Sequence, residues 1–151
     1  MIYTVVLNST SKVVGSTTTN ALFNFDWSYL PDNEKYKMSY TFCSDAIAMT
    51  TLATIPCLYV QLSQSNIYTN SITTGATTTN MIGVLSPFNI GAVSFLYADT
   101  QINSPIYLNH KPVNNVIKVD ILTNASPPVN WADSSAVAVQ NYILTLTFET
   151  I

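Results

Sequence analysis

Charge is scarce in this chain, and arginine is missing altogether. Charged residues make up 9% of the 151 residues, against about 25% in an average soluble domain. The five cations are all lysines, and the net charge is -3. A surface that binds nucleic acid needs several cations in one stripe, usually with arginine among them, to neutralise phosphates. We therefore expect no direct contact with DNA or RNA.

Long hydrophobic runs are also lacking. A membrane helix needs roughly 18 continuous apolar residues, and the most apolar region, Ala46 to Val60, is interrupted by threonines and a proline. The opening residues, MIYTVVLNST, have neither the basic region nor the small-residue cleavage site of a signal peptide. We expect no membrane span and synthesis in the cytosol.

Histidine, cysteine and glycine are too few for the common chemical sites. The single histidine, His110, has no serine in a nucleophile-elbow context to act on, and no cluster of zinc ligands surrounds it in the sequence. The four glycines are isolated and cannot form a phosphate-binding loop. Cys43 and Cys57 are expected to stay reduced and to pack as small hydrophobic groups. The sequence therefore predicts no enzyme activity, no metal and no cofactor.

Small neutral polar residues take the place of charge. Threonine, serine and asparagine together make up a third of the chain. A buried hydroxyl or amide is satisfied by one or two hydrogen bonds, whereas an unpaired buried charge costs several kcal/mol. Such a surface is suited to permanent contacts with other proteins.

Apolar residues recur with a period of two, which is typical of strands with one buried face. In residues 36–44, for example, Met38, Tyr40 and Phe42 alternate with polar positions. About nine strands are expected, over residues 2–8, 21–27, 36–44, 57–64, 81–86, 92–99, 105–108, 115–122 and 141–151. Residues 44–53 are compatible with either a short helix or an irregular loop.

Short antiparallel strands with one apolar face each can bury those faces by pairing two sheets or by closing a barrel. We expect an all-β fold: a two-sheet antiparallel sandwich, in the form of a single jelly roll of about eight strands, with residues 1–151 as one domain. An immunoglobulin sandwich is less suitable, because Cys43 and Cys57 are too close in sequence for its core signature. The turn-rich segments 64–80 and 124–139 are expected to make contacts.

Aromatic residues are abundant, with nine tyrosines, six phenylalanines and two tryptophans. Trp131, Tyr97 and Tyr107 could form a platform that stacks on a sugar, or could lie in the core or at a protein interface, where aromatic residues are enriched. Placement in the core or at a protein interface is favoured. The candidate interface residues are His110, Lys111, Trp131 and Tyr68.

Five segments, in order along almost the whole chain, carry a family resemblance: MIYTVVLNST, FDWSYLPDNEKYKMSYTF, MIGVL, YADTQINSPIYLNHKPVNNVIKVDIL and NYILTLTFETI. In these segments the chain resembles small structural proteins of large eukaryotic double-stranded DNA viruses and of their polinton-like or virophage relatives. Members of that group often have arginine where Lys111 stands. Since lysine cannot form the bidentate fork of arginine, a specific carboxylate contact at that loop is not carried over.

The resemblance implies a single jelly roll that serves as a minor capsid or vertex (penton) protein in an icosahedral shell. The implied partners are the major capsid protein and other capsid subunits, with a homo-pentamer among the expected assemblies. The implied location is the virion, assembled in the host cell cytoplasm. The alternative from the residues alone is a lectin-like or receptor-binding β-sandwich that recognises a carbohydrate or protein ligand.

Overall fold

The structure is a computed structural model that describes residues 1–45, 47–48, 57–62, 70–74, 77–91, 94–99, 105–123 and 141–151. Short 3-10 helices, η1 (Ser9–Ser11) and η2 (Trp27–Tyr29), precede and follow the second strand. The strands are β1 (Ile2–Asn8), β2 (Asn20–Asn24), β3 (Tyr36–Ser44), β4 (Ile47–Ala48), β5 (Leu58–Leu62), β6 (Asn70–Thr74), β7 (Thr77–Met81), β8 (Gly83–Gly91), β9 (Ser94–Asp99), β10 (Ile106–Leu108), β11 (Val116–Thr123) and β12 (Tyr142–Thr150).

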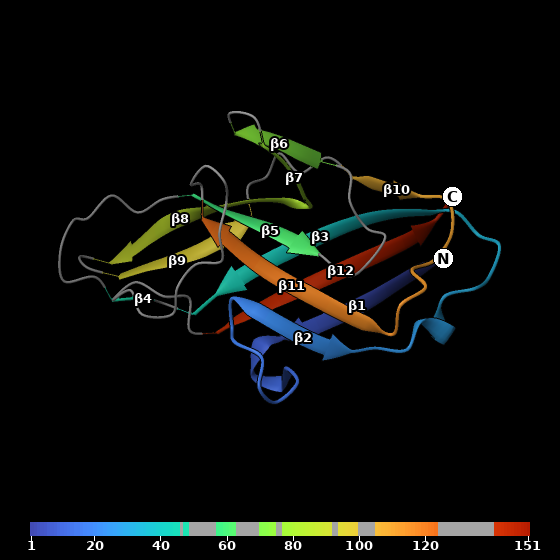
Figure 1. The fold of residues 1–151 in the computed structure, drawn as a ribbon, viewed down its shortest axis with the longest axis horizontal. Coiled ribbons are helices and arrows are strands. Elements are labelled where there is room, and N and C mark those ends of the chain that lie inside the picture. Colours follow the sequence, from blue (N-terminus) through green and yellow to red (C-terminus); the bar gives the residue numbers. More distant parts are fainter. Residues whose placement is uncertain are drawn as a thin grey trace.

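The predicted all-β, antiparallel fold is confirmed. Ten strands form one sheet along the path β1-β12-β3-β9-β8-β5-β11-β2, with β10 and β4 attached to β3 and β9. This sheet curves into a nearly closed barrel (Figure 1). Hydrogen bonding through the β8–β9 pair links the two halves of the path, so the division into two separate sheets stays a prediction.

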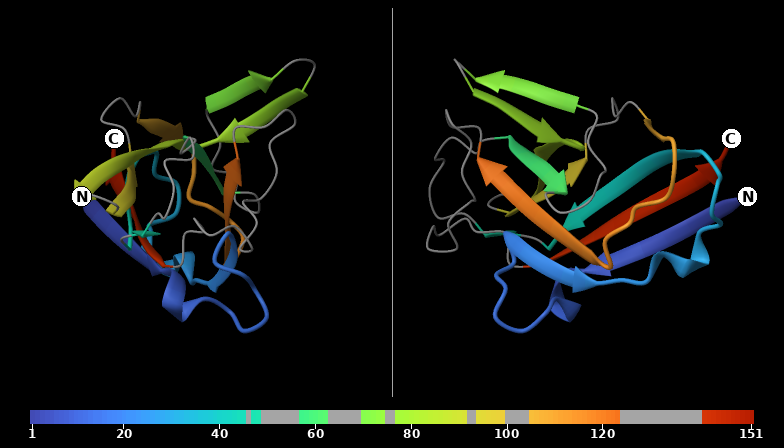
Figure 2. Two further views of the ribbon diagram at one scale, coloured as in Figure 1. Left: turned by 90° about the vertical axis from the view of Figure 1, so that its left-hand side faces the viewer. Right: turned by 45° about the vertical axis from the view of Figure 1, so that its right-hand side comes forward.

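The strands β6 and β7 form a separate two-stranded sheet that projects from the barrel (Figure 2). These two strands and β4 are the strands that the sequence pattern did not predict. Strand β6, and β7 up to its last residue Met81, lie in the turn-rich segment 64–80, which was expected to be a loop. The β4 strand occupies Ile47–Ala48, within the segment left open between helix and loop; residues 46 and 49–53 of that segment lie outside the described residues.

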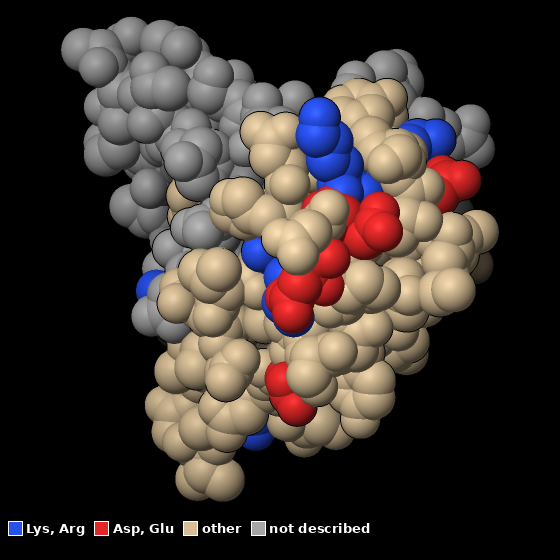
Figure 3. All heavy atoms as spheres, turned by 90° about the vertical axis from the view of Figure 1, so that its right-hand side faces the viewer, with Lys and Arg blue, Asp and Glu red and all other residues tan. Residues whose placement is uncertain are grey.

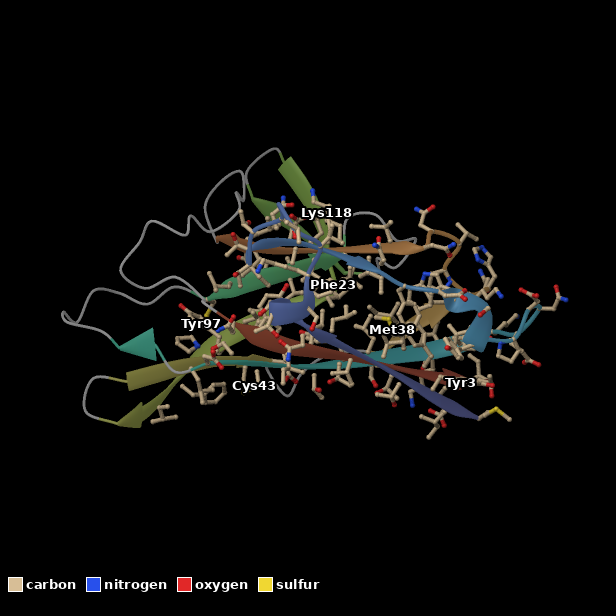
Figure 4. The ribbon with its side chains drawn as sticks, turned by 90° about the horizontal axis from the view of Figure 1, so that it is seen from below. Tyr3, Phe23, Met38, Cys43, Tyr97 and Lys118 are labelled. Carbon is tan, nitrogen blue, oxygen red and sulfur yellow. The ribbon has the colours of Figure 1, made fainter. Side chains whose placement is uncertain are left out.

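The alternation of apolar residues produces the core as expected. On β12, Tyr142, Leu144, Leu146 and Phe148 are all buried, and the predicted inward positions of β3, β5 and β11 are buried as well. Figure 4 shows Phe23 and Met38 in the space between the two facing layers of the curved sheet. Because strands from both ends of the chain contribute, the core ties distant segments together.

The segment after β2 departs from the predicted strand 21–27. The strand ends at Asn24, and Asp26 caps η2 by accepting a hydrogen bond from the Ser28 backbone N–H at 2.9 Å. Trp27 nevertheless reaches the core, where its ring packs edge-on against Phe148 with ring centroids 5.5 Å apart. Its indole N–H donates to the Asn114 carbonyl at 2.6 Å. A capped turn therefore places the tryptophan where strand alternation was expected to place it.

One glycine allows a close approach inside the barrel. Gly83, at the start of β8, lies directly against the buried Tyr40 ring of β3. A Cβ atom at Gly83 would lie 2.5 Å from the Tyr40 Cζ atom and 2.8 Å from its Cε1 atom, closer than carbon atoms can pack. The contact is possible only because glycine lacks that atom.

A second, smaller apolar cluster lies outside the main core. Tyr59, Met81 and Leu122 are buried together, with the partly buried Val84 packed against them. Met81 ends β7, so this cluster anchors the root of the projecting hairpin to β5 and β11. Across the described ranges, no helix has the length and apolar character needed to cross a membrane.

Candidate interaction surface

The predicted interface residues His110 and Lys111 follow β10, in the connection to β11. His110 is exposed, and its Nδ1 atom lies 3.2 Å from the Lys111 carbonyl oxygen. Lys111 is tied to the rest of the molecule instead of being presented to solvent. Its Nζ atom lies 2.7 Å from the Asp32 carboxylate and donates to the Leu30 carbonyl at 3.2 Å.

These contacts give Lys111 an internal role at one end of the barrel. It connects the β10–β11 segment to the segment after η2, across 81 residues of sequence. The neighbouring Asp26 has a lowered pKa, caused mainly by hydrogen bonds from the Ser28 backbone and side chain and, to a smaller extent, by attraction to Lys111. Lys111 thus organises this end of the fold, and of the two residues only His110 is freely accessible.

The remaining predicted site residues divide into three groups. Trp131 and Tyr68 lie outside the described residues. Tyr97 is fully buried in the main core, which agrees with the favoured placement in the core or at an interface and removes this residue from the alternative sugar-stacking platform. Tyr107 is 62% exposed on β10. The inward direction of Tyr97 follows from the register of β9 against β8, which the sequence pattern does not reveal.

Charged side chains gather at the end of the barrel that holds both termini (Figure 3). Two ion pairs lie there, Lys111 with Asp32 at 2.7 Å and Lys37 with Glu149 at 3.6 Å. Because cations and carboxylates alternate, this end has no extended field of one sign. It offers no stripe of positive charge that could follow a phosphate backbone.

The outer face of β1, β12 and β3 is almost free of charge. Apart from the Lys37–Glu149 pair at one margin, the outward positions are neutral hydroxyl, thiol or aliphatic side chains. We call this set the neutral face; its members are Ile2, Thr4, Val6, Ile143, Thr145, Thr147, Ser39, Thr41 and Cys43. Two aliphatic members, Ile2 and Val6, lie on either side of Thr4 on β1 and are 65% and 60% exposed.

A groove runs along the free edge of β1. It has a volume of about 430 Å³ and lies between the residues Ile2 to Val5 and the side chains of Phe25, Tyr29 and Leu30. All of its lining residues are uncharged. The sequence pattern identified β1 as a strand but not as an exposed edge, because edge position depends on strand order. The available signal was the lack of charge throughout residues 1–8.

The two cysteines are unpaired, as expected, but neither packs in the core as a small hydrophobic group. Cys43 and Cys57 are free thiols with exposed side chains, and Figure 4 shows Cys43 on the outer side of β3. Within the described part of the chain, no three histidine, cysteine or acidic residues come together as metal ligands could.

Comparisons with protein-family models, curated proteins and solved structures found no match to this chain.

Proposed function

We propose that this chain is a structural subunit of an icosahedral viral capsid, a minor capsid or vertex protein built on a single jelly roll. The observation that carries the proposal is the strand order. The path β1-β12-β3-β9 is followed by β8-β5-β11-β2, so each half of the path holds four main strands.

The chain alternates between these halves in the manner of a jelly roll. It crosses from one half to the other between β1 and β2, between β2 and β3, between β3 and β5, between β9 and β11, and between β11 and β12. The β8–β9 hairpin joins the halves directly. This alternation of eight strands between two halves supports the proposed jelly roll, a fold found in viral capsid and lectin domains.

The neutral face supports a role in assembly. Capsid subunits exchange much of their surface for contacts with neighbours, and hydroxyl-rich, aliphatic surfaces are buried without the desolvation cost of unpaired charge. The proposed partners are the major capsid protein and other capsid subunits, in a virion assembled in the host cytoplasm. With five lysines and no arginine, the chain is proposed to contact proteins and not the genome.

An antibody raised against the purified chain tests this proposal. We expect it to label purified icosahedral virus particles, with gold label concentrated at vertices if the chain is the penton. Labelling lost after pre-incubation of the antibody with the purified chain would show specificity. Particles without the chain would contradict the proposal; glycan binding by the purified chain that is lost in Trp131→Ala would then favour the sugar-recognising alternative.

A further inference from the structure

The two edge strands of the nearly closed barrel differ in whether another part of the chain covers their outer backbone groups. The sheet path ends at β1 on one side and β2 on the other. The outer edge of β2 is covered by its own chain, because the Leu22 carbonyl accepts from the Val13 N–H at 2.7 Å and the Leu22 N–H donates to the Ser16 hydroxyl at 3.3 Å. The corresponding edge of β1 has no such cover among the described residues.

The backbone of β1 presents a regular row of groups at that edge. The Thr150 N–H donates to the Met1 carbonyl at 3.0 Å, which makes Met1 and Thr150 a hydrogen-bonded pair. In an antiparallel ladder such pairs alternate, so the backbone groups of Tyr3 and Val5 point to β12. Those of Ile2, Thr4 and Val6 therefore point outward, toward the open edge.

This edge lacks the usual protection against pairing. Natural edge strands carry charged side chains, prolines or bulges that prevent another strand from adding to them. The β1 sequence IYTVVLN has no charge and no proline, and its register with β12 is unbroken from Ile2 to Asn8. The groove beside it is uncharged and apolar on its far wall. The site fits an extended, uncharged strand.

The β6–β7 hairpin has the complementary properties. Residues 63–80 contain no charged residue, and a two-stranded sheet by itself is only marginally stable in water. The hairpin projects from the side of the molecule away from β1 (Figure 2). It can therefore reach a neighbouring molecule without bringing its own barrel into the groove, whereas β1 of a second copy lies flush with its barrel.

We infer that the β6–β7 hairpin of one copy adds to the β1 edge of the next copy of this chain, in the groove beside Phe25 and Tyr29. Donor and acceptor are different surfaces of the molecule, so the contact is head-to-tail and closes into a ring when the rotation allows. The inference rests on the proposed function, because a ring of five is what a vertex position requires.

Two variants separate the donor from the acceptor. Val6→Lys places a charge on the exposed outward face at the edge, and Val14→Lys is its matched control, because Val14 is fully exposed and lies outside the strands. The second variant replaces residues 71–80 with Asn-Gly. Since Asn70 and Met81 are directly paired, this turn closes the shortened hairpin and keeps its anchor.

Native mass by light scattering gives the readout, with thermal unfolding as the check that each variant folds. We expect the unmodified chain and Val14→Lys to form a ring of several 16.6 kDa chains, and each of the two test variants to be monomeric. An equimolar mixture of the two test variants should give dimers and no rings, because only one intact contact can form. Thr4→Pro, which removes an edge N–H, replaces Val6→Lys if the latter fails to fold.

Three results would overturn the inference: a monomeric unmodified chain, a ring that persists in the shortened-hairpin variant, or a dimer lost only in Val6→Lys, which would indicate that β1 pairs with β1. None of these bears on whether the antibody labels virus particles. A labelled particle with a monomeric chain would refute the ring and leave the capsid role standing.

Discussion

The contact between Gly83 and Tyr40 gives the sharpest test of how this barrel is packed. In Gly83→Ala the added Cβ atom would lie 2.5 Å from Tyr40 Cζ and 2.8 Å from Cε1, so the buried ring must move. Overpacking a core costs about 1–3 kcal/mol, and the lower backbone entropy of alanine in the unfolded chain returns about 0.4–1 kcal/mol. We expect a net loss of about 1–2 kcal/mol, measured by urea denaturation.

A double-mutant cycle assigns that loss to the ring. In a Tyr40→Leu background the flat ring is gone, so Gly83→Ala should become neutral or stabilise by up to about 1 kcal/mol. Gly15→Ala is the control, because Gly15 has a φ of +91° and open space around it. It should cost about 1–2 kcal/mol through backbone strain, equally with and without Tyr40. An unchanged cost of Gly83→Ala in the Tyr40→Leu background would refute the packing argument.

Four further outcomes are expected. Tyr142→Phe should keep the free energy of unfolding or raise it by up to about 1 kcal/mol, because the Tyr142 hydroxyl is buried without a partner among the described residues. Tyr36→Phe should lower it by about 1 kcal/mol, because the change removes a 2.6 Å hydrogen bond. Melting curves compare the two variants. Burial raises the pKa of Tyr142 above its usual 10.0. Above about pH 10 the unfolded chain therefore ionises at this group before the folded chain does, and the free energy of unfolding should fall. Urea denaturation across that pH range should show a shallower fall in Tyr142→Phe. Lys111→Ala should cost more than Asp32→Ala in the same assay, because Lys111 also bonds a backbone carbonyl and the exposed carboxylate contributes less than about 1 kcal/mol. The native mass should change little between low and high salt, because screening acts on charges that the neutral face lacks; dissociation on adding salt would contradict this.

The sequence predicted the strands whose apolar residues alternate with polar ones, and it missed β6 and β7, whose residues are mostly small and polar. In β12 large apolar residues occupy every second position from Tyr142 to Phe148, so both its extent and its inward side chains could be predicted. β6 and β7 consist mostly of threonine, serine and asparagine around Gly75, a composition that strands share with loops. Their pairing, such as Ile72 with Thr79, becomes visible only in three dimensions.

The candidate site was harder to predict than the strands, because its residues are defined by contacts across long sequence distances. Lys111 looked like a loop cation, and its partner Asp32 is far away in the chain. For Tyr97 the sequence left core and interface open, and the structure places it in the core. The open edge of β1 depends on which strand lies last in the sheet, which no local pattern contains.

The position of β1 at the end of the sheet also sets the order of events during synthesis. Its ladder partner is β12 (Tyr142–Thr150), so residues 2–8 must wait while the intervening chain is translated. At about 5–20 residues per second this interval is on the order of ten seconds. During that time an uncharged, unprotected strand has no native partner on its own chain. The same features that make β1 an open edge in the finished molecule therefore make the nascent chain dependent on dilution or on chaperones until its C-terminal strand emerges.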